Sequence, residues 1–354
     1  MKIFTLFFVL ILLGINTFGR DIIIRKSSDF TQPSVEVATS KPLKIGIISS
    51  PNVIGKYTQL LYNVSLATLS SRKKEHFAIK RYDIKDESSV SLKVAIDDAQ
   101  RDGMDAILAP LTATGAKNFA TLPLNLPVYI PTVHKRDLES APENITFGGI
   151  DYSAQIEALL PYMSDSIAIF YDDSSVGTQL KSITEEVFLA HKSEKKKVQA
   201  YSVDTKGDNI ISHLSKPSKF NKNSVIIHIP VVKSAILASQ MTFNGIHERN
   251  ILSTQINLDP TLLLLTQYGD RKNMIIANSL IEFPTGIYTA NMMMNNEMST
   301  DWIAYSTSVG IDYLVSLLDH SQREYGMRII HSQVIYPVEL YRAKEFGFEP
   351  LSSK

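Results

Sequence analysis

The sequence predicts an α/β protein made of two Rossmann-like lobes, each built on a central parallel sheet, with hinge strands joining them. Buried strands alternate with helices of about ten to fifteen residues, which is the pattern of parallel sheets covered on both faces. This pattern occurs as two series, separated by the glycine pair Gly148-Gly149, which suits a crossing between lobes. The length of 354 residues also fits two domains.

The first series begins with a buried strand at 44–49 and a helix at 54–72, where apolar residues recur at helical spacing. A βαβα unit follows at 77–126, and a short central strand at 127–131 continues the series. Helical spacing predicts that the inner stripe of the helix in the βαβα unit consists of Val90, Val94, Ala95 and Ala99.

The second series has the same alternation, and a further stretch of chain returns after it. Its strands are expected at 166–171, 198–203, 225–229 and 273–277, and its helices at 177–191, 208–214 and 233–244. A strongly apolar helix at 302–319 and a strand at 334–341 then follow.

Because the chain continues with a helix and a strand after the second series, we predict that each lobe is built from two separate segments of the chain. We expect lobe 1 to comprise residues 43–150 plus about 280–325, and lobe 2 to comprise 151–279 plus about 326–354. Loops at the carboxyl ends of parallel strands then line a cleft between the lobes, which is where open α/β folds bind ligands.

The composition excludes one class of partner. The chain is 44% hydrophobic and 20% charged, with 36 basic and 36 acidic residues and a formal net charge of zero. Nucleic-acid binding needs a concentrated positive face, so a nucleic-acid partner is not expected.

Residues 1–19 read as a secretory signal peptide. Lys2 supplies the positive charge, residues 3–15 form an apolar core, and 17–19 form a cleavage site, with cleavage expected near Gly19-Arg20. Residues 20–42 read as a flexible polar leader. No cysteine is present, so neither a lipid anchor nor a disulfide can form. These features predict a periplasmic protein with no stable membrane insertion after cleavage.

Signals of catalysis are absent from the sequence. It has no GxSxG elbow, no phosphate-binding P-loop, no GxGxxG after the first strand and no cysteine nucleophile. Its eight histidines form no HxxH or HExxH pair. We therefore expect neither an enzyme nor a cofactor or metal site.

Candidate ligand-binding residues follow the predicted strands. Thr112, Ala113 and Thr114 lie in the loop after the strand near 106–110, where an adjacent helix N-terminus could favour an anion. Thr114 could instead simply cap that helix. The other candidates are Ser50, after the first strand, Thr132 and His134, after 127–131, and Asp151, near the crossing. An exposed loop position is the alternative for His134.

The order of segments from Lys44 to Leu351 resembles the type I periplasmic-binding-protein fold, in particular the branched-chain amino-acid-binding group and the related LppC- and LpoA-like envelope proteins. The motifs that carry the resemblance are DGMDAILAP at 102–110, PVYIP at 127–131, AIFYD at 168–172 with Gly177, and the closing segment 336–351. The resemblance implies a bilobal fold that closes on a ligand by hinge motion.

The resemblance also assigns site residues by position. Thr112, Ala113 and Thr114 stand where the amino-acid binders hold the ligand carboxylate. Thr132 and His134 stand in the next ligand loop, and Asp151 matches an acidic position near the crossing. Gln255 stands at the position of the acidic residue that neutralises the ligand ammonium, and an amide cannot do this.

Two functions are compatible with these observations. The first is a non-catalytic periplasmic solute-binding protein that recognises a small polar or anionic ligand between its lobes, with a transporter as its candidate partner. The second is a scaffold or regulatory subunit of an envelope protein assembly, in which the same fold has a vestigial cleft.

Overall fold

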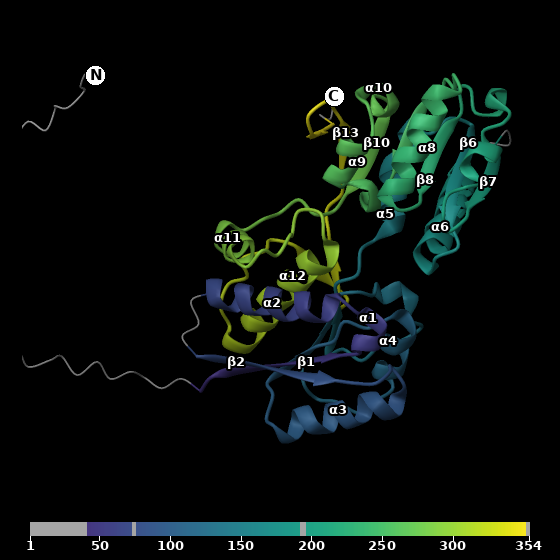
Figure 1. The fold of residues 1–354 in the computed structure, drawn as a ribbon. Coiled ribbons are helices and arrows are strands. Elements are labelled where there is room, and N and C mark those ends of the chain that lie inside the picture. The colour runs from purple at the N-terminus through teal and green to yellow at the C-terminus, as the bar shows by residue number, and fades with distance from the viewer. Residues whose placement is uncertain (1–40, 73–75, 192–195, 352–354) are drawn as a thin grey trace, which may run out of the picture. The chain divides into compact units, whose positions relative to one another are not determined.

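The computed structural model describes residues 41–72, 76–191 and 196–351, which form two seven-stranded, mostly parallel sheets covered by helices (Figure 1). The first sheet has the order β11-β12-β5-β4-β3-β1-β2, and the second has the order β14-β13-β10-β9-β8-β6-β7. Only the pairs that involve β11, β13 and β14 are antiparallel. The predicted α/β class with two parallel sheets is thereby confirmed.

The first lobe is built around the first sheet. Its strands are β1 (Leu43–Ser49), β2 (Phe77–Asp83), β3 (Ala106–Leu108), β4 (Val128–Ile130), β5 (Ile145–Phe147), β11 (Arg328–Ile330) and β12 (Gln333–Ile335). Its helices are α1 (Pro51–Ile54), α2 (Tyr57–Ser71), α3 (Ser89–Arg101), α4 (Ala113–Ala120), η1 (Lys135–Asp137), α11 (Thr285–Met293) and α12 (Trp302–Asp319).

The second lobe is built around the second sheet. Its strands are β6 (Ser166–Asp172), β7 (Lys197–Val203), β8 (Ser224–His228), β9 (Asn250–Ser253), β10 (Met274–Asn278), β13 (Glu339–Ala343) and β14 (Phe348–Pro350). Its helices are α5 (Tyr152–Leu159), η2 (Leu160–Tyr162), α6 (Ser175–Ala190), α7 (Ile210–His213), η3 (Pro217–Lys219), α8 (Val231–Phe243), η4 (Gln255–Asn257), α9 (Pro260–Leu265) and α10 (Tyr268–Arg271).

Each sheet buries apolar side chains on both faces. In lobe 1, one core joins β1, β3 and β4 to α2 and α12, and the opposite core joins the sheet to α3 and α4. In lobe 2, one core lies under α5 and α6, and the other lies under α7, α8 and α9. Strands buried on both faces explain why β1, β3 and β8 read as continuous apolar runs in the sequence.

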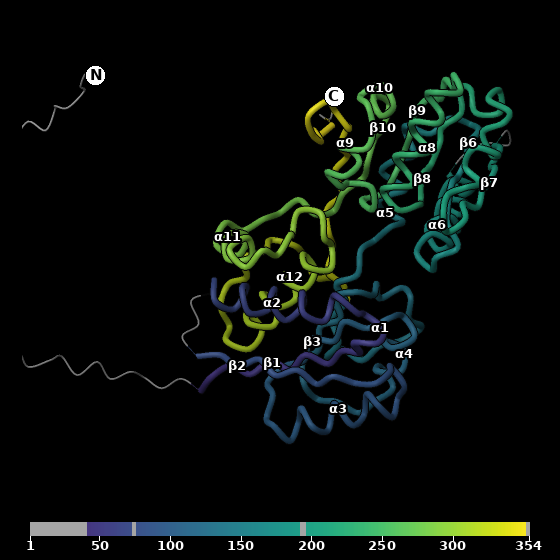
Figure 2. The backbone as a smooth tube through the Cα atoms, in the orientation of Figure 1, coloured from purple at the N-terminus to yellow at the C-terminus, as the bar shows by residue number. Residues whose placement is uncertain are grey.

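The chain passes between the lobes three times, after β5, after β10 and after β12, a path that can be followed in Figure 2. Ser306 of α12 links two of these crossings, because its hydroxyl donates to the carbonyl oxygens of Pro131 and Gly148 and accepts from the Tyr336 hydroxyl. Gly148 has no room for a side chain, since a Cβ there would lie 2.0 Å from the Tyr129 hydroxyl oxygen. The crossings are therefore anchored by buried polar contacts.

The sequence prediction assigned residues from 326 onward to lobe 2, and this was wrong for the first part of the segment. β11 and β12 pair in the first sheet, with Gln333 beside Phe147 of β5. Only β13 and β14 extend the second sheet. The single strand predicted at 334–341 is in fact divided between β12 and β13, which belong to different sheets, so periodicity did not reveal that the chain crosses between the lobes there.

The predicted inner stripe of α3 was also wrong in part. Val90 is 76% exposed and Val94 is 57% exposed. The buried side chains of the helix are Leu92, Ala95, Ile96 and Ala99. The buried stripe therefore passes through Leu92 and Ile96 and not through the two valines, because both choices satisfy helical spacing.

The predicted signal peptide (1–19) and most of the leader (20–42) lie outside the described residues. Within the described ranges, no helix is long and apolar enough to cross a membrane.

Candidate functional site

The loop before α4 begins the helix in a different way from the sequence prediction. Thr112, and not Thr114, is the N-cap, and its hydroxyl oxygen accepts from the Gly115 amide at 3.1 Å. The same hydroxyl donates to the carboxylate of Glu87, and the Thr112 amide donates to both Glu87 oxygens at 3.1 and 3.2 Å. The amide and hydroxyl of Thr112, one of the two threonines that were expected to hold a ligand carboxylate, therefore bind a carboxylate of the protein itself.

Glu87 is firmly placed in this position. Its side chain is almost fully buried, and its own carbonyl oxygen accepts from the Asn118 side chain of α4 at 2.8 Å. Gly115 makes room for the carboxylate, because a Cβ on Gly115 would lie 2.1 Å from the nearer Glu87 oxygen. A carboxylate at a helix N-terminus is also favoured by the helix dipole. A ligand anion could reach Thr112 only by displacing Glu87.

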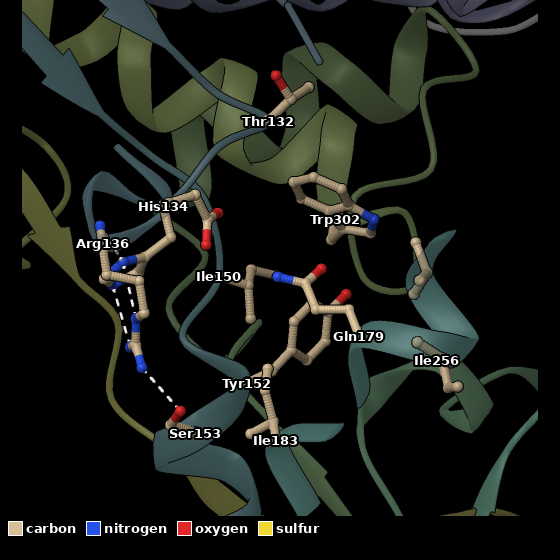
Figure 3. Close-up of a pocket in the computed structure, with 12 residues that line it drawn as sticks. Thr132, His134, Arg136, Ile150, Tyr152, Ser153, Gln179, Ile183, Ile256 and Trp302 are labelled. Carbon is tan, nitrogen blue, oxygen red and sulfur yellow. Dashed lines mark hydrogen bonds between the residues drawn. The ribbon is translucent and has the colours of Figure 1, made fainter. Parts of the chain in front are cut away.

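A cavity of about 170 Å³ lies elsewhere, between residues of both lobes (Figure 3). Lobe 1 contributes the loop after β4 and the first residue of α12, and lobe 2 contributes the first turn of α5, part of α6 and η4. The residues that line it are Thr132, His134, Arg136, Asp137, Ile150, Tyr152, Ser153, Val176, Gln179, Ile183, Ile256 and Trp302.

Each nitrogen of the Arg136 guanidinium has a partner at the edge of this cavity. The guanidinium forms an ion pair with Asp151, donates to the Ser153 hydroxyl at 2.7 Å and donates through Nε to Nδ1 of His134 at 3.0 Å. Asp151 in turn caps α5 by accepting from the Ala154 amide. The positive charge of Arg136 is therefore neutralised by a carboxylate that the fold holds in place.

His134 is held neutral by its surroundings. Burial, followed by the adjacent Arg136 charge, lowers the pKa of His134 to about 4, although Asp151 opposes the shift. The imidazole therefore carries no charge at neutral pH, and both of its nitrogens lie within hydrogen-bond distance of Arg136.

Asp137 is the second charged residue of the cavity wall. Its side chain is half-buried, and burial raises its pKa despite the nearby charges of Arg136 and Lys117. Among the described residues, no lysine, arginine or histidine nitrogen lies within ion-pair distance of the Asp137 carboxylate, whereas Arg136 is paired with Asp151. The cavity therefore carries one carboxylate without a direct cationic partner.

The rest of the wall is mostly apolar and aromatic. Trp302 comes from lobe 1, and Tyr152 from lobe 2, where burial raises the pKa of its hydroxyl to about 12. Figure 3 shows Trp302, Tyr152 and Gln179 directed into the same space, with Ile150 beside them. A ligand here would meet aromatic faces from both lobes.

The remaining predicted site residues lie away from this cavity. Gln255 is buried in lobe 2, where its side-chain oxygen accepts from Gln155 at 2.7 Å and from the Ser279 amide at 3.2 Å. Ser50 donates to the carbonyl oxygen of Lys85. Gln255 and Ser50 thus take part in internal structure, as Thr112 does, and the exposed Ala113 and Thr114 also do not line the cavity.

Of the predicted residues, Thr132 and His134 line the cavity and Asp151 binds Arg136 beside it. Sequence reasoning missed Arg136 and Asp137, although they lie within three residues of His134 in a loop that it had singled out. It also missed Trp302, because no local motif connects a residue near position 300 with a loop near position 134.

Comparison with known proteins identifies the fold. No protein-family model and no curated protein matches the sequence. Solved structures do match: an extracellular ligand-binding receptor from Verminephrobacter eiseniae aligns with a TM-score of 0.64 at 10% identity, covering 88% of this chain and 100% of that one. The chain therefore has the fold of the type I periplasmic binding proteins, which confirms the resemblance seen in the sequence.

Two further matches represent the two groups named from the sequence. The branched-chain amino acid transporter substrate-binding protein LivJ from Streptococcus pneumoniae, in complex with isoleucine, aligns with a TM-score of 0.61 at 11% identity, covering 87% of this chain and 98% of that one. The C-domain of LpoA from Haemophilus influenzae, a regulator of PBP1A, aligns with a TM-score of 0.57 at 10% identity, covering 87% and 100%. The fold is thus used both for solute binding and for regulating another protein.

Proposed function

We propose that the chain is a non-catalytic, two-lobe binding protein that takes up a small ligand in the cavity around Trp302. The observation that supports this is the composition of the wall, since Trp302 and His134 come from lobe 1 and Tyr152 and Gln179 from lobe 2. A ligand that contacts both lobes favours the arrangement in which these contacts form together, which is how hinged binding proteins respond to ligands.

The size of the cavity restricts the ligand. A cavity of about 170 Å³ is close to the roughly 150 Å³ of an engineered apolar cavity that accepts benzene. It is smaller than the ~300–1,000 Å³ of ordinary drug-sized pockets. We infer a ligand whose buried part is about one ring in size.

The location belongs to the same proposal. The expected signal peptide at 1–19 and the absence of cysteine support an exported protein that works in the periplasm without a lipid anchor. A membrane transporter that accepts the ligand is the partner that suits this role, since matched structures include transporter substrate-binding proteins.

Trp302 provides a direct test, because it is the single tryptophan of the chain. A metabolite panel should contain compounds that change Trp302 fluorescence in a saturable way and raise the melting temperature. At 100 times Kd the stabilisation is about 2.7 kcal/mol. Ile183→Phe, which enlarges a cavity-lining residue, should weaken binding. Ile211→Phe should not, since Ile211 is 63% exposed and lies outside the cavity. Saturable binding that Ile183→Phe leaves unchanged would place the site elsewhere.

A second candidate function is supported by a different observation on lobe 2. Large apolar side chains are exposed around α8, α9 and the β13–β14 turn: Phe243 at 84%, Leu264 at 84% and Phe346 at 91%. Exposed apolar clusters on soluble proteins often mark contacts with other proteins. The chain would then be a scaffold or regulatory subunit of an envelope assembly.

The two candidates give opposite results in one pair of experiments. If the chain is a scaffold, no compound changes Trp302 fluorescence. A partner protein then co-purifies with the wild type but not with the double variant Phe243→Ser/Leu264→Ser. For a ligand-binding protein, the panel yields a ligand, and the double variant binds it as the wild type does.

A further inference from the structure

We propose that the ligand carries a protonated amine on a flat apolar body, with the Asp137 carboxylate as its counter-ion and the Trp302 ring as its platform. This rests on the proposed function, because it specifies the ligand class for the same cavity. It replaces the anionic ligand that the sequence predicted at Thr112 and Thr114.

The first argument concerns the two fully charged residues of the cavity wall, Arg136 and Asp137. Arg136 already has three partners, the carboxylate of Asp151, the Ser153 hydroxyl and the His134 ring. An anionic ligand would have to compete with Asp151, which is fixed as the N-cap of α5. Because charge-assisted arginine–carboxylate contacts are among the strongest polar contacts in proteins, this competition is unfavourable.

The second argument concerns Asp137. Within the described part of the chain, no cation lies at ion-pair distance from it, and Lys117 acts on it only from the exposed side of α4. Burial raises the pKa of Asp137 although a hydrogen bond with the His134 backbone and the charges of Arg136 and Lys117 oppose the shift, so burial disfavours its ionised form more than these groups stabilise it. A ligand cation would supply the missing partner, and a ligand anion would meet repulsion.

The third argument concerns the other side chains that line the cavity together with Asp137. Trp302 and Tyr152 are aromatic, and tryptophan is the side chain whose ring face attracts cations most strongly. Ile150, Ile183 and Ile256 provide apolar contact for the body of the ligand. Aromatic and aliphatic walls beside one carboxylate suit an amine on a ring better than a free sugar or an inorganic ion.

The fourth argument is the supply of hydrogen-bond acceptors. A primary ammonium group has three N–H donors and needs three acceptors when buried. Asp137 can provide one, the Gln179 side-chain oxygen a second, and Thr132 a third, because the Thr132 hydroxyl donates to the Leu111 carbonyl oxygen and keeps its lone pairs. The cavity wall thus offers three side chains with the acceptor atoms that a buried ammonium group needs.

The test uses three ring-sized probes that differ in one group: benzylamine, benzyl alcohol and sodium benzoate. Each is titrated into the full-length mature protein while Trp302 fluorescence is recorded. We expect benzylamine to bind at least tenfold more tightly than benzyl alcohol, and benzoate to bind most weakly. Asp137→Asn should weaken benzylamine binding at least tenfold and change benzyl alcohol binding by less than about twofold.

Glu139→Gln is the matched control, because Glu139 is an exposed carboxylate two residues further along the same loop and does not line the cavity. It should leave all three affinities unchanged. If Asp137→Asn does not fold, the order of the three probes on the wild type decides alone.

Tightest binding of benzoate, or equal binding of the amine and the alcohol, would overturn the amine class and leave the cavity as a ligand site. Failure of all three probes also overturns the ligand class. The proposed function fails separately, when no member of the wider metabolite panel changes Trp302 fluorescence.

Discussion

The contact between Glu87 and Thr112 makes a prediction about stability. Glu87→Ala removes the carboxylate that accepts from the Thr112 amide and hydroxyl. Hydrogen bonds to charged groups contribute about 1.5–3 kcal/mol each. Because Thr112 is exposed, water can hydrogen-bond to its amide and hydroxyl in the variant and recover part of this stabilisation. We expect the free energy of unfolding to fall by about 2 kcal/mol, including the loss of the carboxylate at the α4 N-terminus.

Urea denaturation and thermal melting measure this loss. A change of about 2 kcal/mol corresponds to a melting temperature lower by roughly 4–8 °C for a unit the size of one lobe. Asp83→Ala is the matched control, since Asp83 is a half-exposed carboxylate nearby whose only ion pair is with Arg81 among the described residues. Surface pairs of this kind contribute about 0–1 kcal/mol.

Gly115 extends the test to a double-mutant cycle. Gly115→Ala alone should destabilise the wild type, because its Cβ would lie 2.1 Å from a Glu87 oxygen. In the Glu87→Ala background this penalty should shrink by more than ~1 kcal/mol, since the two positions are in direct contact. A Glu87→Ala loss within 0.5 kcal/mol of Asp83→Ala, or additive effects of Glu87→Ala and Gly115→Ala, would refute the view that the carboxylate occupies the Thr112 donors.

Three further predictions concern the scaffold. Burial lowers the pKa of His228 to about 3, so between pH 6.5 and 3 only the unfolded state takes up this proton and stability is lost as the pH falls. Urea denaturation at pH 7 and 4.5 should show a loss smaller by about 2–3 kcal/mol in His228→Phe than in the wild type, and equal losses would contradict it. Gly310→Ala places a Cβ 2.1 Å from the Tyr129 ring and should lower the free energy of unfolding by ~3 kcal/mol or more, measured by thermal melting. Gly286→Ala is the control, since no atom lies near its Cβ, and it should be neutral or stabilising in the same assay. His320 ends α12 with φ 59°, so His320→Gly should raise stability by about 0.5–1 kcal/mol, and an unchanged or lower melting temperature would count against a strained cap.

Periodicity predicted the fold class well because it reports which faces are buried. The strands β1, β3 and β8 are buried on both faces, and their apolar runs are visible in the sequence. The sequence predicted less reliably which face of a helix is buried. In α3, Leu92 is buried and Val90 is exposed, although a buried stripe through either residue fits the helical spacing.

The candidate site was harder to predict because it depends on contacts between distant residues. The position of Thr112 in the fold was anticipated, but the carboxylate of Glu87, 25 residues earlier, binds its donors. A resemblance compares positions one by one and cannot show that a neighbouring loop supplies an internal substitute for a ligand. Trp302 and Tyr152 likewise line one cavity only because the chain crosses between the lobes.

The order of strands also bears on how the chain is made. β11 and β12 extend one sheet, and β13 and β14 extend the other, so neither sheet is complete until residues beyond Arg328 have been synthesised. A nascent chain that lacks this segment exposes the edges of β5 and β10, which raises the cost of folding early. We therefore expect stable folding of both lobes to await the synthesis of residues 328–350.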